Sequence, residues 1–253
     1  MALVGSQFTG SGVEKKTRYL RTKMKRAIIT YAAGAHEELL DIALPTYKDF
    51  AQRHGYDLII GEKMCSLPPA WNKIPLLLNT LEILKYDEVV WFDCDLVVVN
   101  PTEDFPPLLD NPSKLHAMVR HFEDNSEVPN SGVWRLRRGG EQLLQDTLGL
   151  EVFRNHGWWE QAALMTLMGY CVPPEGSVFS DTKCKCVYQT MWHTVCQFMR
   201  LKYNSHPNYR AEKPVIVHCS YQNMAKRLDV MRALVKDPAF DYPRYEVTVE
   251  TKE

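Results

Sequence analysis

Two aspartates, Asp93 and Asp95, stand one residue apart directly after the apolar run 89–92. That run is rich in β-branched and aromatic residues, which predicts a buried strand. Because a carboxylate is costly to bury without a partner, we expect both side chains at the carboxyl end of the strand, where open α/β sheets bind ligands. Two carboxylates there can share a divalent cation, which cancels their mutual repulsion. The alternative for so short a motif is a turn or a helix cap after the strand.

A third ligand for such a cation is His218, which ends the apolar run 214–217 late in the chain. Mn²⁺ accepts carboxylate oxygen and imidazole nitrogen together. Asp93, Asp95 and His218 therefore predict a manganese site, with Mg²⁺ as the other candidate. The alternative is a core histidine held by ordinary hydrogen bonds.

Two further groups of polar residues stand where they can contact a ligand. Lys73 begins an apolar helix next to Trp71, and a lysine at a helix N-terminus favours anions. Asn130 and Ser131 precede Gly132, which permits close backbone approach, and both side chains can hydrogen-bond a polyhydroxyl ligand. The alternatives are a surface lysine beside a half-exposed tryptophan and a simple turn that enters a strand.

Glu160 and Gln161 are polar neighbours at the start of an otherwise apolar, aromatic helix that opens with Trp158 and Trp159. A helix that buries one side rarely keeps two such residues in the core without a role. They are therefore further candidates for a substrate site, unless both face solvent.

The elements that must position these residues alternate between strands and helices. Apolar periodicity and turn residues predict strands at 27–34, 56–60, 89–92, 115–120 and 214–218, and helices at 37–54, 71–85, 141–154, from 158, and at 222–235. The stretch 121–129 is expected to be a polar loop, and 171–190 to be irregular. Short joints between strand, helix and strand imply right-handed parallel units, and hence an α/β fold with a mostly parallel central sheet flanked by helices.

Composition fits one sizeable globular domain and disfavours several classes of protein. The chain has 253 residues, of which 45% are hydrophobic and 24% charged. A net charge of −1 gives no basic field for nucleic acid or an anionic membrane. No apolar stretch approaches the roughly 20 residues of a membrane span, and the basic N-terminal region lacks the apolar core of a signal peptide. Dinucleotide oxidoreductases, P-loop enzymes and serine hydrolases are disfavoured because their glycine-rich motifs are missing.

Seven cysteines, an odd number, predict reduced thiols and a cytoplasmic location. Several of them gather with a histidine in a loose cluster: Cys171, Cys184, Cys186, His193 and Cys196. The spacing matches no standard zinc motif, so a loop with free thiols is the alternative to a structural zinc site.

Taken in order, these motifs resemble those of glycosyltransferases with the GT-A fold, a single Rossmann-like domain. The group they resemble most is the GMA12/MNN10 family of galactosyl-, mannosyl- and xylosyltransferases, with a more distant similarity to glycogenin-like transferases. Five segments carry the resemblance: Trp71-Asn72-Lys73, Val90 to Asp95, Asn130-Ser131-Gly132-Val133, Trp159-Glu160-Gln161 and Val217-His218. The resemblance spans residues 26–236, which would be the catalytic domain, between a basic leader at 1–25 and a C-terminal tail at 237–253.

The resemblance implies a role for each of these residues. Asp93, Asp95 and His218 would bind Mn²⁺, and the metal would hold the diphosphate of a nucleotide sugar. Lys73, with Lys226 or Arg227, would add positive charge at the diphosphate. Thr30, Tyr31 and Ala32 would contact the base, and Asp93 would also contact the ribose. The donor sugar or the acceptor would be contacted by Asn130, Glu160 and Gln161, and Gln161 would lie near the anomeric carbon.

The implied activity is transfer of a hexose or pentose from a nucleoside-diphosphate sugar, UDP- or GDP-linked, to an acceptor hydroxyl with retention of configuration. Glu160 stands where the family has aspartate, so the sugar pocket can differ from that of the family. The acceptor stays open between a glycan, a lipid, a protein and a modified nucleobase, and the oligomeric state is open too. The alternatives are a nucleotidyltransferase, although the loop at 32–36 is poor in basic residues, and a GT-A domain that binds nucleotide sugars without turnover.

Overall fold

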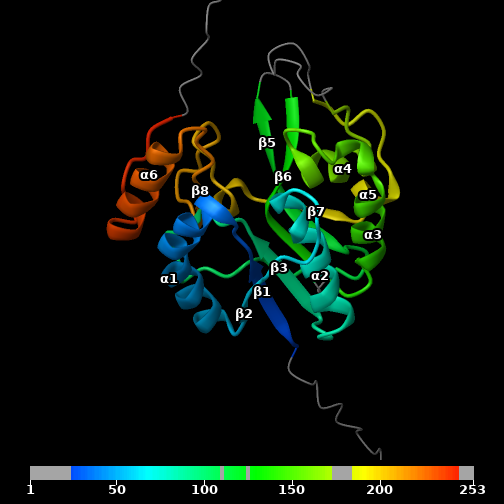
Figure 1. Ribbon diagram of the computed structural model, residues 1–253, viewed down its shortest axis with the longest axis horizontal. Coiled ribbons are helices and arrows are strands. Elements are labelled where there is room, and N and C mark those ends of the chain that lie inside the picture. The colour runs from blue at the N-terminus through cyan, green and yellow to red at the C-terminus, as the bar shows by residue number, and fades with distance from the viewer. Residues whose placement is uncertain (1–23, 109–110, 124–125, 173–183, 245–253) are drawn as a thin grey trace, which may run out of the picture.

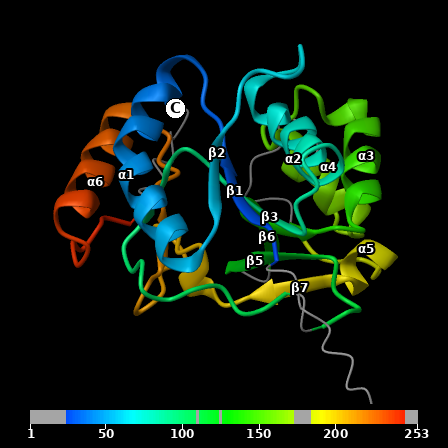
Figure 2. The same ribbon diagram turned by 90° about the horizontal axis from the view of Figure 1, so that it is seen from below.

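A computed structural model describes residues 24–108, 111–123, 126–172 and 184–244 and arranges them in three layers (Figure 1). A six-stranded sheet lies between α1 and α6 on one side and α2, α3 and α4 on the other (Figure 2). The helices are α1 Glu37–His54, α2 Lys73–Glu82, α3 Glu141–Gly149, α4 Trp159–Leu167, α5 Met191–Thr194 and α6 Met224–Lys236. The strands are β1 Arg26–Thr30, β2 Asp57–Ile60, β3 Glu88–Phe92, β4 Leu96–Val98, β5 His116–Glu123, β6 Ser126–Arg137, β7 Cys196–Met199 and β8 Ile216–His218.

The strand order in the central sheet is β2-β1-β3-β6-β5-β7, and β4 and β8 form a separate two-stranded sheet. β1 pairs in parallel with β2 and β3, and β5 pairs in parallel with β7. β6 runs antiparallel to both of its neighbours, β3 and β5. Five of the six strands therefore point the same way, which confirms the predicted α/β fold with a mostly parallel sheet flanked by helices.

β3 is buried on both faces because its side chains alternate between two hydrophobic cores. Val90 and Phe92 pack in the core that α1 and α6 cover, whereas Val89 and Trp91 pack in the core that α2, α3 and α4 cover. A strand covered in this way reads as a continuous apolar run in the sequence. It ends where the first side chain that cannot be buried alone, Asp93, follows.

Two segments of the sheet differ from the sequence prediction. The expected polar loop 121–129 supplies the paired ends of β5 and β6, which lie opposite each other in antiparallel register. A hairpin with one face towards solvent tolerates polar side chains, so its amino-acid composition resembles that of a loop. The edge strand β7 was not predicted, because four residues are too few for a period-two pattern to stand out.

Other boundaries differ at the ends of elements. The helix expected at 141–154 ends at Gly149, and a separate 3₁₀ turn follows at Glu151–Phe153. Residues 237–244, expected to begin a tail, pack on the domain: Tyr242 is buried and its hydroxyl lies 2.8 Å from Ser205 Oγ. Most of the expected leader at 1–25 lies outside the described residues, as does 173–183 within the cysteine-rich stretch.

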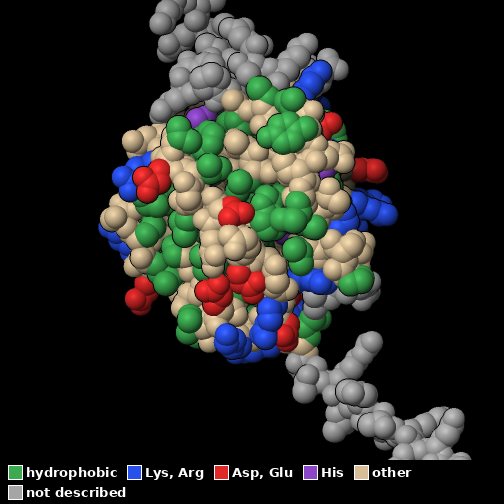
Figure 3. Space-filling model, turned by 90° about the vertical axis from the view of Figure 1, so that its right-hand side faces the viewer, with side chains coloured by type: hydrophobic (Ala, Val, Ile, Leu, Met, Phe, Trp, Pro, Cys, Tyr) green, Lys and Arg blue, Asp and Glu red, His purple; other side chains and the backbone are tan. Residues whose placement is uncertain are grey.

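The surface agrees with the near-neutral net charge. On the face that carries α3, α4 and α5, apolar and acidic side chains are mixed, and the basic side chains lie towards the edges (Figure 3). Among the described residues, no helix combines the length and the apolar character needed to cross a membrane.

Candidate metal and nucleotide-sugar site

Asp93 and Asp95 lie in the turn between β3 and β4, at the carboxyl end of the buried strand, as the sequence predicts. Tyr47 of α1 holds this turn, because its hydroxyl donates to the carbonyl oxygens of Asp93, at 2.6 Å, and Leu96, at 3.0 Å. Cys94, between the two aspartates, packs against the core that α1 and α6 cover.

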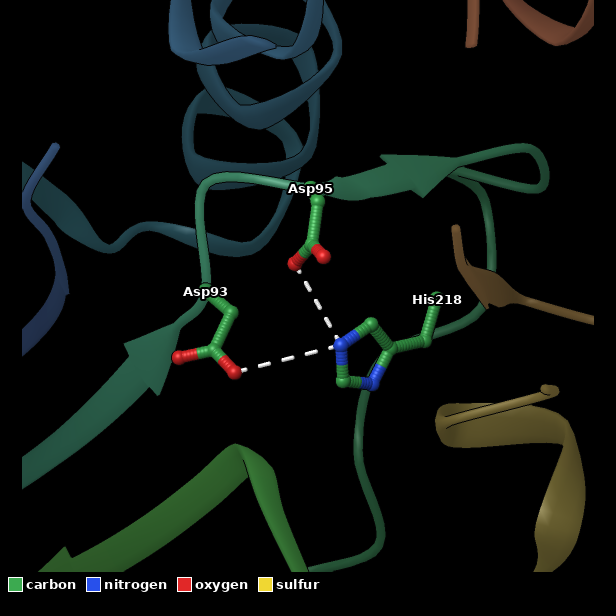
Figure 4. Close-up of side chains that lie close together, drawn as sticks. All are labelled: Asp93, Asp95 and His218. Atoms are coloured by element: carbon green, nitrogen blue, oxygen red, sulfur yellow. Dashed lines mark ion pairs between the residues drawn. The ribbon is translucent and has the colours of Figure 1, made fainter. Parts of the chain in front are cut away.

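His218 reaches the aspartates because β8 pairs antiparallel with β4, in a register that sets His218 opposite Leu96. Its Nε2 lies 3.3 Å from Asp95 Oδ1 and 3.9 Å from Asp93 Oδ2, and the ring nitrogen faces both carboxylates (Figure 4). The ring also lies against β6: a Cβ added at Gly132 would be 2.5 Å from His218 Cε1. Only glycine therefore leaves room for the imidazole in this position.

The three side chains fit a divalent cation. One ligand atom from each lies within 4.8 Å of the others. Neighbouring ligands of an octahedral cation, each roughly 2.1 Å from it, are about 3 Å apart. The distances of 3.3 and 3.9 Å from His218 Nε2 to the two carboxylates are close to that spacing. The mixed oxygen and imidazole set suits Mn²⁺. Within the described ranges this is the one group of three or more His, Cys, Asp or Glu side chains so spaced, so Cys171, Cys184, Cys186, His193 and Cys196 form no such cluster.

Lys73 is buried and joins the aspartates to α4. Its Nζ lies 3.2 Å from Asp93 Oδ1 and 2.6 Å from Glu160 Oε1. The ammonium also donates to Ser131, to the carbonyl oxygen at 3.2 Å and to the hydroxyl at 3.0 Å. With 3% of its surface exposed, Lys73 is not the surface lysine of the alternative interpretation.

Glu160 and Gln161 extend from the first turn of α4 to the same residue of β6. Glu160 Oε1 accepts a hydrogen bond from Ser131 Oγ at 3.1 Å, and Gln161 Oε1 accepts one from the Ser131 N–H at 3.0 Å. The other carboxylate oxygen, Glu160 Oε2, is buried and has no hydrogen-bond partner in the described part of the chain. A buried acceptor without a partner is a place where a ligand hydroxyl can donate. Trp159 begins α4 at a φ of 42°, a left-handed conformation that costs roughly 1–3 kcal/mol and is often found at functional sites.

A bulge in β6, formed by Ser131, Gly132 and Val133, directly follows Asn130 beside the site. The β5–β6 register pairs Val119 with Asn130 but Met118 with Trp134, so three residues of β6 lack partners on β5. Bulges of this kind re-aim side chains beside active sites. Asn130 is thus part of a strand rather than of the simple turn that its sequence also allowed.

Charge and burial oppose each other around Lys73. Burial lowers the pKa of Lys73, but the carboxylates of Asp93 and Glu160 raise it, and the net pKa is raised. Burial raises the pKa of Glu160, only partly offset by the ammonium of Lys73, so this pKa is raised as well. Lys73 therefore stays charged, and Glu160 is a weaker acid than an exposed glutamate.

The same opposition sets the charges of the predicted metal ligands. Burial lowers the pKa of His218, but Asp95 and Asp93 raise it, and the net pKa lies above its ordinary value. For Asp95, burial raises the pKa, whereas His218 and Arg227 lower it, and the net pKa is well below its ordinary value. Asp95 is therefore ionised, and its charge is balanced by the positive groups beside it.

Thr30, Tyr31 and Ala32 leave the sheet at the same edge as the aspartates, because Thr30 pairs with Phe92 in the β1–β3 register. Thr30 is fully buried, and its Oγ1 has no hydrogen-bond partner in the described part of the chain. Tyr31 and Ala32 are each partly buried, one against each core. Their predicted contact with a nucleotide base is compatible with this position and stays a prediction.

α6 directs Arg227, rather than Lys226, towards the aspartates. Arg227 NH1 lies 3.3 Å from Asp95 Oδ2, whereas Lys226 Nζ lies 5.4 Å from the centroid of the Tyr221 ring. Consecutive residues point about 100° apart around a helix, so the sequence alone does not choose between them. The contact of Lys226 with a diphosphate stays a prediction.

Sequence reasoning missed Asn204, which links two parts of the site. Its Nδ2 donates to Asn130 Oδ1 at 2.7 Å, and its Oδ1 lies 3.1 Å from His218 Nδ1. No motif marks this residue, because it lies in the irregular stretch after the 3₁₀ turn Leu201–Tyr203.

Known structures share this architecture, although no family model and no curated protein sequence matches the chain. A glycosyltransferase involved in the glycosylation of the major capsid of PBCV-1 aligns with a TM-score of 0.61 at 14% identity, over 83% of this chain and 99% of its own. The chain has the GT-A fold. The galactosyltransferase LgtC, in complex with donor and acceptor sugar analogues, aligns over 82% of this GT-A chain and 95% of its own, with a TM-score of 0.50 and 10% identity. GlyE of Streptococcus pneumoniae TIGR4 aligns with a TM-score of 0.50 at 14% identity over 87% of this chain, which spans 65% of the length of GlyE.

Proposed function

We propose that the chain is a metal-dependent glycosyltransferase that moves a hexose or pentose from a nucleoside-diphosphate sugar, UDP- or GDP-linked, to an acceptor hydroxyl. One observation carries the proposal: Asp93, Asp95 and His218 converge at the carboxyl end of β3 in a GT-A fold, with ligand atoms within 4.8 Å of one another. Mn²⁺, or Mg²⁺, bound there would neutralise the negative charge that develops on the leaving diphosphate.

The residues around these ligands support distinct tasks. Arg227, at 3.3 Å from Asp95, and Lys73, at 3.2 Å from Asp93, add fixed positive charge on two sides of the carboxylate pair. Positive charge fixed in advance stabilises a developing phosphate anion without a cost of reorganisation during the reaction. The unpartnered Glu160 Oε2 supports a contact with a hydroxyl of the donor sugar.

The proposed reaction retains the configuration of the sugar. The bond between the anomeric carbon and the phosphate oxygen breaks, and the acceptor oxygen bonds to the same face of that carbon. Gln161 cannot take up a proton, and Glu160 is engaged by Lys73 at 2.6 Å, so neither serves readily as a general base. The acceptor proton therefore passes to the leaving phosphate oxygen.

The finer assignments belong to the same proposal. The order of motifs supports kinship with the GMA12/MNN10 family, and the acceptor is a glycan, a lipid, a protein or a modified nucleobase. The seven cysteines are all free, which supports a reducing compartment such as the cytoplasm.

A thermal-shift panel of nucleotide sugars, with and without Mn²⁺, tests the proposal. A bound donor at 100 times its Kd stabilises the folded state by about 2.7 kcal/mol. For a chain of this size that raises Tm by roughly 5–10 °C. We expect this rise, beyond the effect of Mn²⁺ alone, only when the metal and the matching donor are both present. If no nucleotide sugar raises Tm in Mn²⁺, the transferase assignment is wrong. Binding without release of the sugar from its diphosphate would instead indicate a non-catalytic nucleotide-sugar-binding module.

A further inference from the structure

Asn204 sits at a junction between the predicted metal ligand His218 and Asn130 on the substrate side. It is fully buried. Its backbone is anchored independently of its side chain, because its carbonyl oxygen lies 2.8 Å from His121 Nε2 and its N–H donates to the carbonyl of Leu201 at 3.0 Å. The side chain of Asn204 is therefore not needed to hold this segment in place.

One backbone donor sets the direction of every hydrogen bond in this junction. The N–H of Gly132 lies 2.9 Å from the side chain of Asn130 and can only donate, so the atom of Asn130 that faces it is Oδ1. The same oxygen lies 2.7 Å from the side chain of Asn204, which must therefore present its Nδ2 there. The remaining atom of that amide, Oδ1, faces Nδ1 of His218 at 3.1 Å, so Nδ1 carries a proton.

A proton on Nδ1 leaves Nε2 as the nitrogen that can bind a cation, and Nε2 is the atom that faces Asp95 and Asp93. The same chain of bonds occupies Asn130 Oδ1 twice, by Gly132 and by Asn204. Asn130 Nδ2 has no partner in the described part of the chain, so it stays available to donate to an oxygen of a substrate.

We propose that Asn204 is a positioning residue that fixes His218 in the Nδ1-protonated form for metal binding and holds Asn130 as a hydrogen-bond donor towards substrate. The inference rests on the proposed function for the identity of the two ligands. A single buried amide thus orients one residue on the metal side, His218, and one on the substrate side, Asn130.

Two variants separate the two halves. Asn204→Ala removes both hydrogen bonds, and we expect the Kd for Mn²⁺ to rise about 10- to 100-fold, the usual effect of losing the partner of a metal-binding histidine. Asn204→Asp keeps an acceptor towards His218 Nδ1 but loses the donor to Asn130. This variant should bind Mn²⁺ as tightly as the wild type, or more tightly, while kcat/KM for sugar transfer falls because Asn130 is no longer held.

The measurements are Mn²⁺ titration calorimetry without nucleotide sugar, and ¹⁵N NMR of the His218 ring in the metal-free protein at high pH. We expect Nδ1-protonated His218 in the wild type and in Asn204→Asp, and a mixture of both neutral forms in Asn204→Ala. The matched control is Asn79→Ala, which removes an amide side chain on α2. This variant should leave the Mn²⁺ Kd and the His218 spectrum unchanged.

Wild-type Mn²⁺ affinity together with an unchanged His218 spectrum in folded Asn204→Ala would overturn the proposal. Should the alanine variant fail to fold, Asn204→Asp decides alone, because a loss of Mn²⁺ affinity in a variant that keeps the acceptor contradicts the assigned role. Neither measurement needs a nucleotide sugar, so failure here differs visibly from failure of the transferase proposal, which would appear as absent nucleotide-sugar binding.

Discussion

β3 has a buried network of charges at each end, and the two networks differ in whether they are complete. At the start of the strand, Glu88 pairs with Arg135 of β6 at 2.5 Å, with both side chains at most 2% exposed. The guanidinium also donates to the carbonyl oxygen of Pro106 at 2.6 Å and lies 5.0 Å from the centroid of the Phe105 ring. One cation meets one anion here, and the network is closed.

Beyond the other end of β3, the carboxylates outnumber the fixed cations. Asp93, Asp95 and Glu160 face Lys73 and Arg227, and one oxygen of Glu160 has no partner among the described residues. This network becomes complete only when a cation and a ligand hydroxyl are added. The two polar networks of β3 therefore have different roles. The closed network of Glu88 and Arg135 holds β3 to β6, and the open network around Asp93, Asp95 and Glu160 is the candidate binding site.

The largest expected effect comes from breaking the open network at its metal ligand. Asp95→Asn keeps the shape of the side chain but removes a charged ligand, and loss of several kcal/mol of charge stabilisation lowers kcat by at least about 10³-fold. Initial rates of Mn²⁺-dependent sugar transfer measure this effect. Asp49→Asn on the surface of α1 is the control and should leave the rate unchanged; an Asp95→Asn enzyme of near-normal rate would contradict the metal assignment.

Breaking the closed network should cost stability instead of activity. Arg135→Met leaves Glu88 buried without a counter-charge, which destabilises a domain by about 3–5 kcal/mol. The free energy of unfolding from urea titration measures the loss, and activity per folded molecule should be unchanged. The double variant Glu88→Leu/Arg135→Met removes both charges and should recover most of the stability; equal losses in the single and double variants would mean that the ion pair is not the cause.

Lys73→Met breaks the open network at its cation, and we expect activity to fall by about 10²-fold because a fixed positive charge is lost from the site. Its stability loss should be smaller than that of Arg135→Met and should shrink as pH falls. The pKa of Glu160, already raised by burial, rises further without the ammonium, so the folded state takes up a proton before the unfolded state does. Stability should therefore increase as pH falls towards the ordinary carboxyl pKa of about 4.3, and a pH-independent deficit in urea titrations would contradict this account.

A smaller effect concerns His116, a buried histidine that lies outside the candidate metal site. His116 has partners for both ring nitrogens, since Nε2 lies 2.8 Å from the Trp192 carbonyl oxygen and Nδ1 accepts from Trp134 Nε1 at 3.3 Å. Burial lowers its pKa from 6.5 to about 4, only partly offset by the Trp192 carbonyl. The unfolded chain takes up a proton first as pH falls, so the stability that His116 contributes is present above pH 6.5 and is lost as pH falls towards 4.

Between pH 6.5 and 5 this loss amounts to about 1.5 kcal/mol of unfolding free energy. The glutamine in His116→Gln cannot titrate. Over the same pH range, urea titrations of this variant should therefore show a loss of unfolding free energy that is smaller than in the wild type by that amount. His36→Gln, an exposed histidine before α1, is the matched control and should keep the wild-type pH dependence. Identical pH profiles for His116→Gln and the wild type would show that the buried ring does not titrate as its surroundings imply.

Much of this molecule was predictable from short stretches of sequence. The run 89–92 predicted β3, and the polar pair that follows it predicted the end of the strand, because alternation and burial are properties of neighbouring residues. The α/β fold followed from the order of such elements. The chemical types of Asp93, Asp95 and His218 also sufficed to propose a divalent cation.

Other features were decided only by contacts between residues far apart in the chain. The β4–β8 pairing sets His218 against the aspartates across more than a hundred residues, and no local pattern encodes that register. The rotation of α6 chooses Arg227 over Lys226 by packing, since the two differ by one step around the helix. Asn204 and the Gly132 N–H set the proton of His218, and the hairpin of β5 and β6 formed from residues whose composition suggested a loop. Local sequence thus determined which groups carry charge, whereas strand register and helix rotation, fixed by burial of side chains from the whole chain, decided which of them meet.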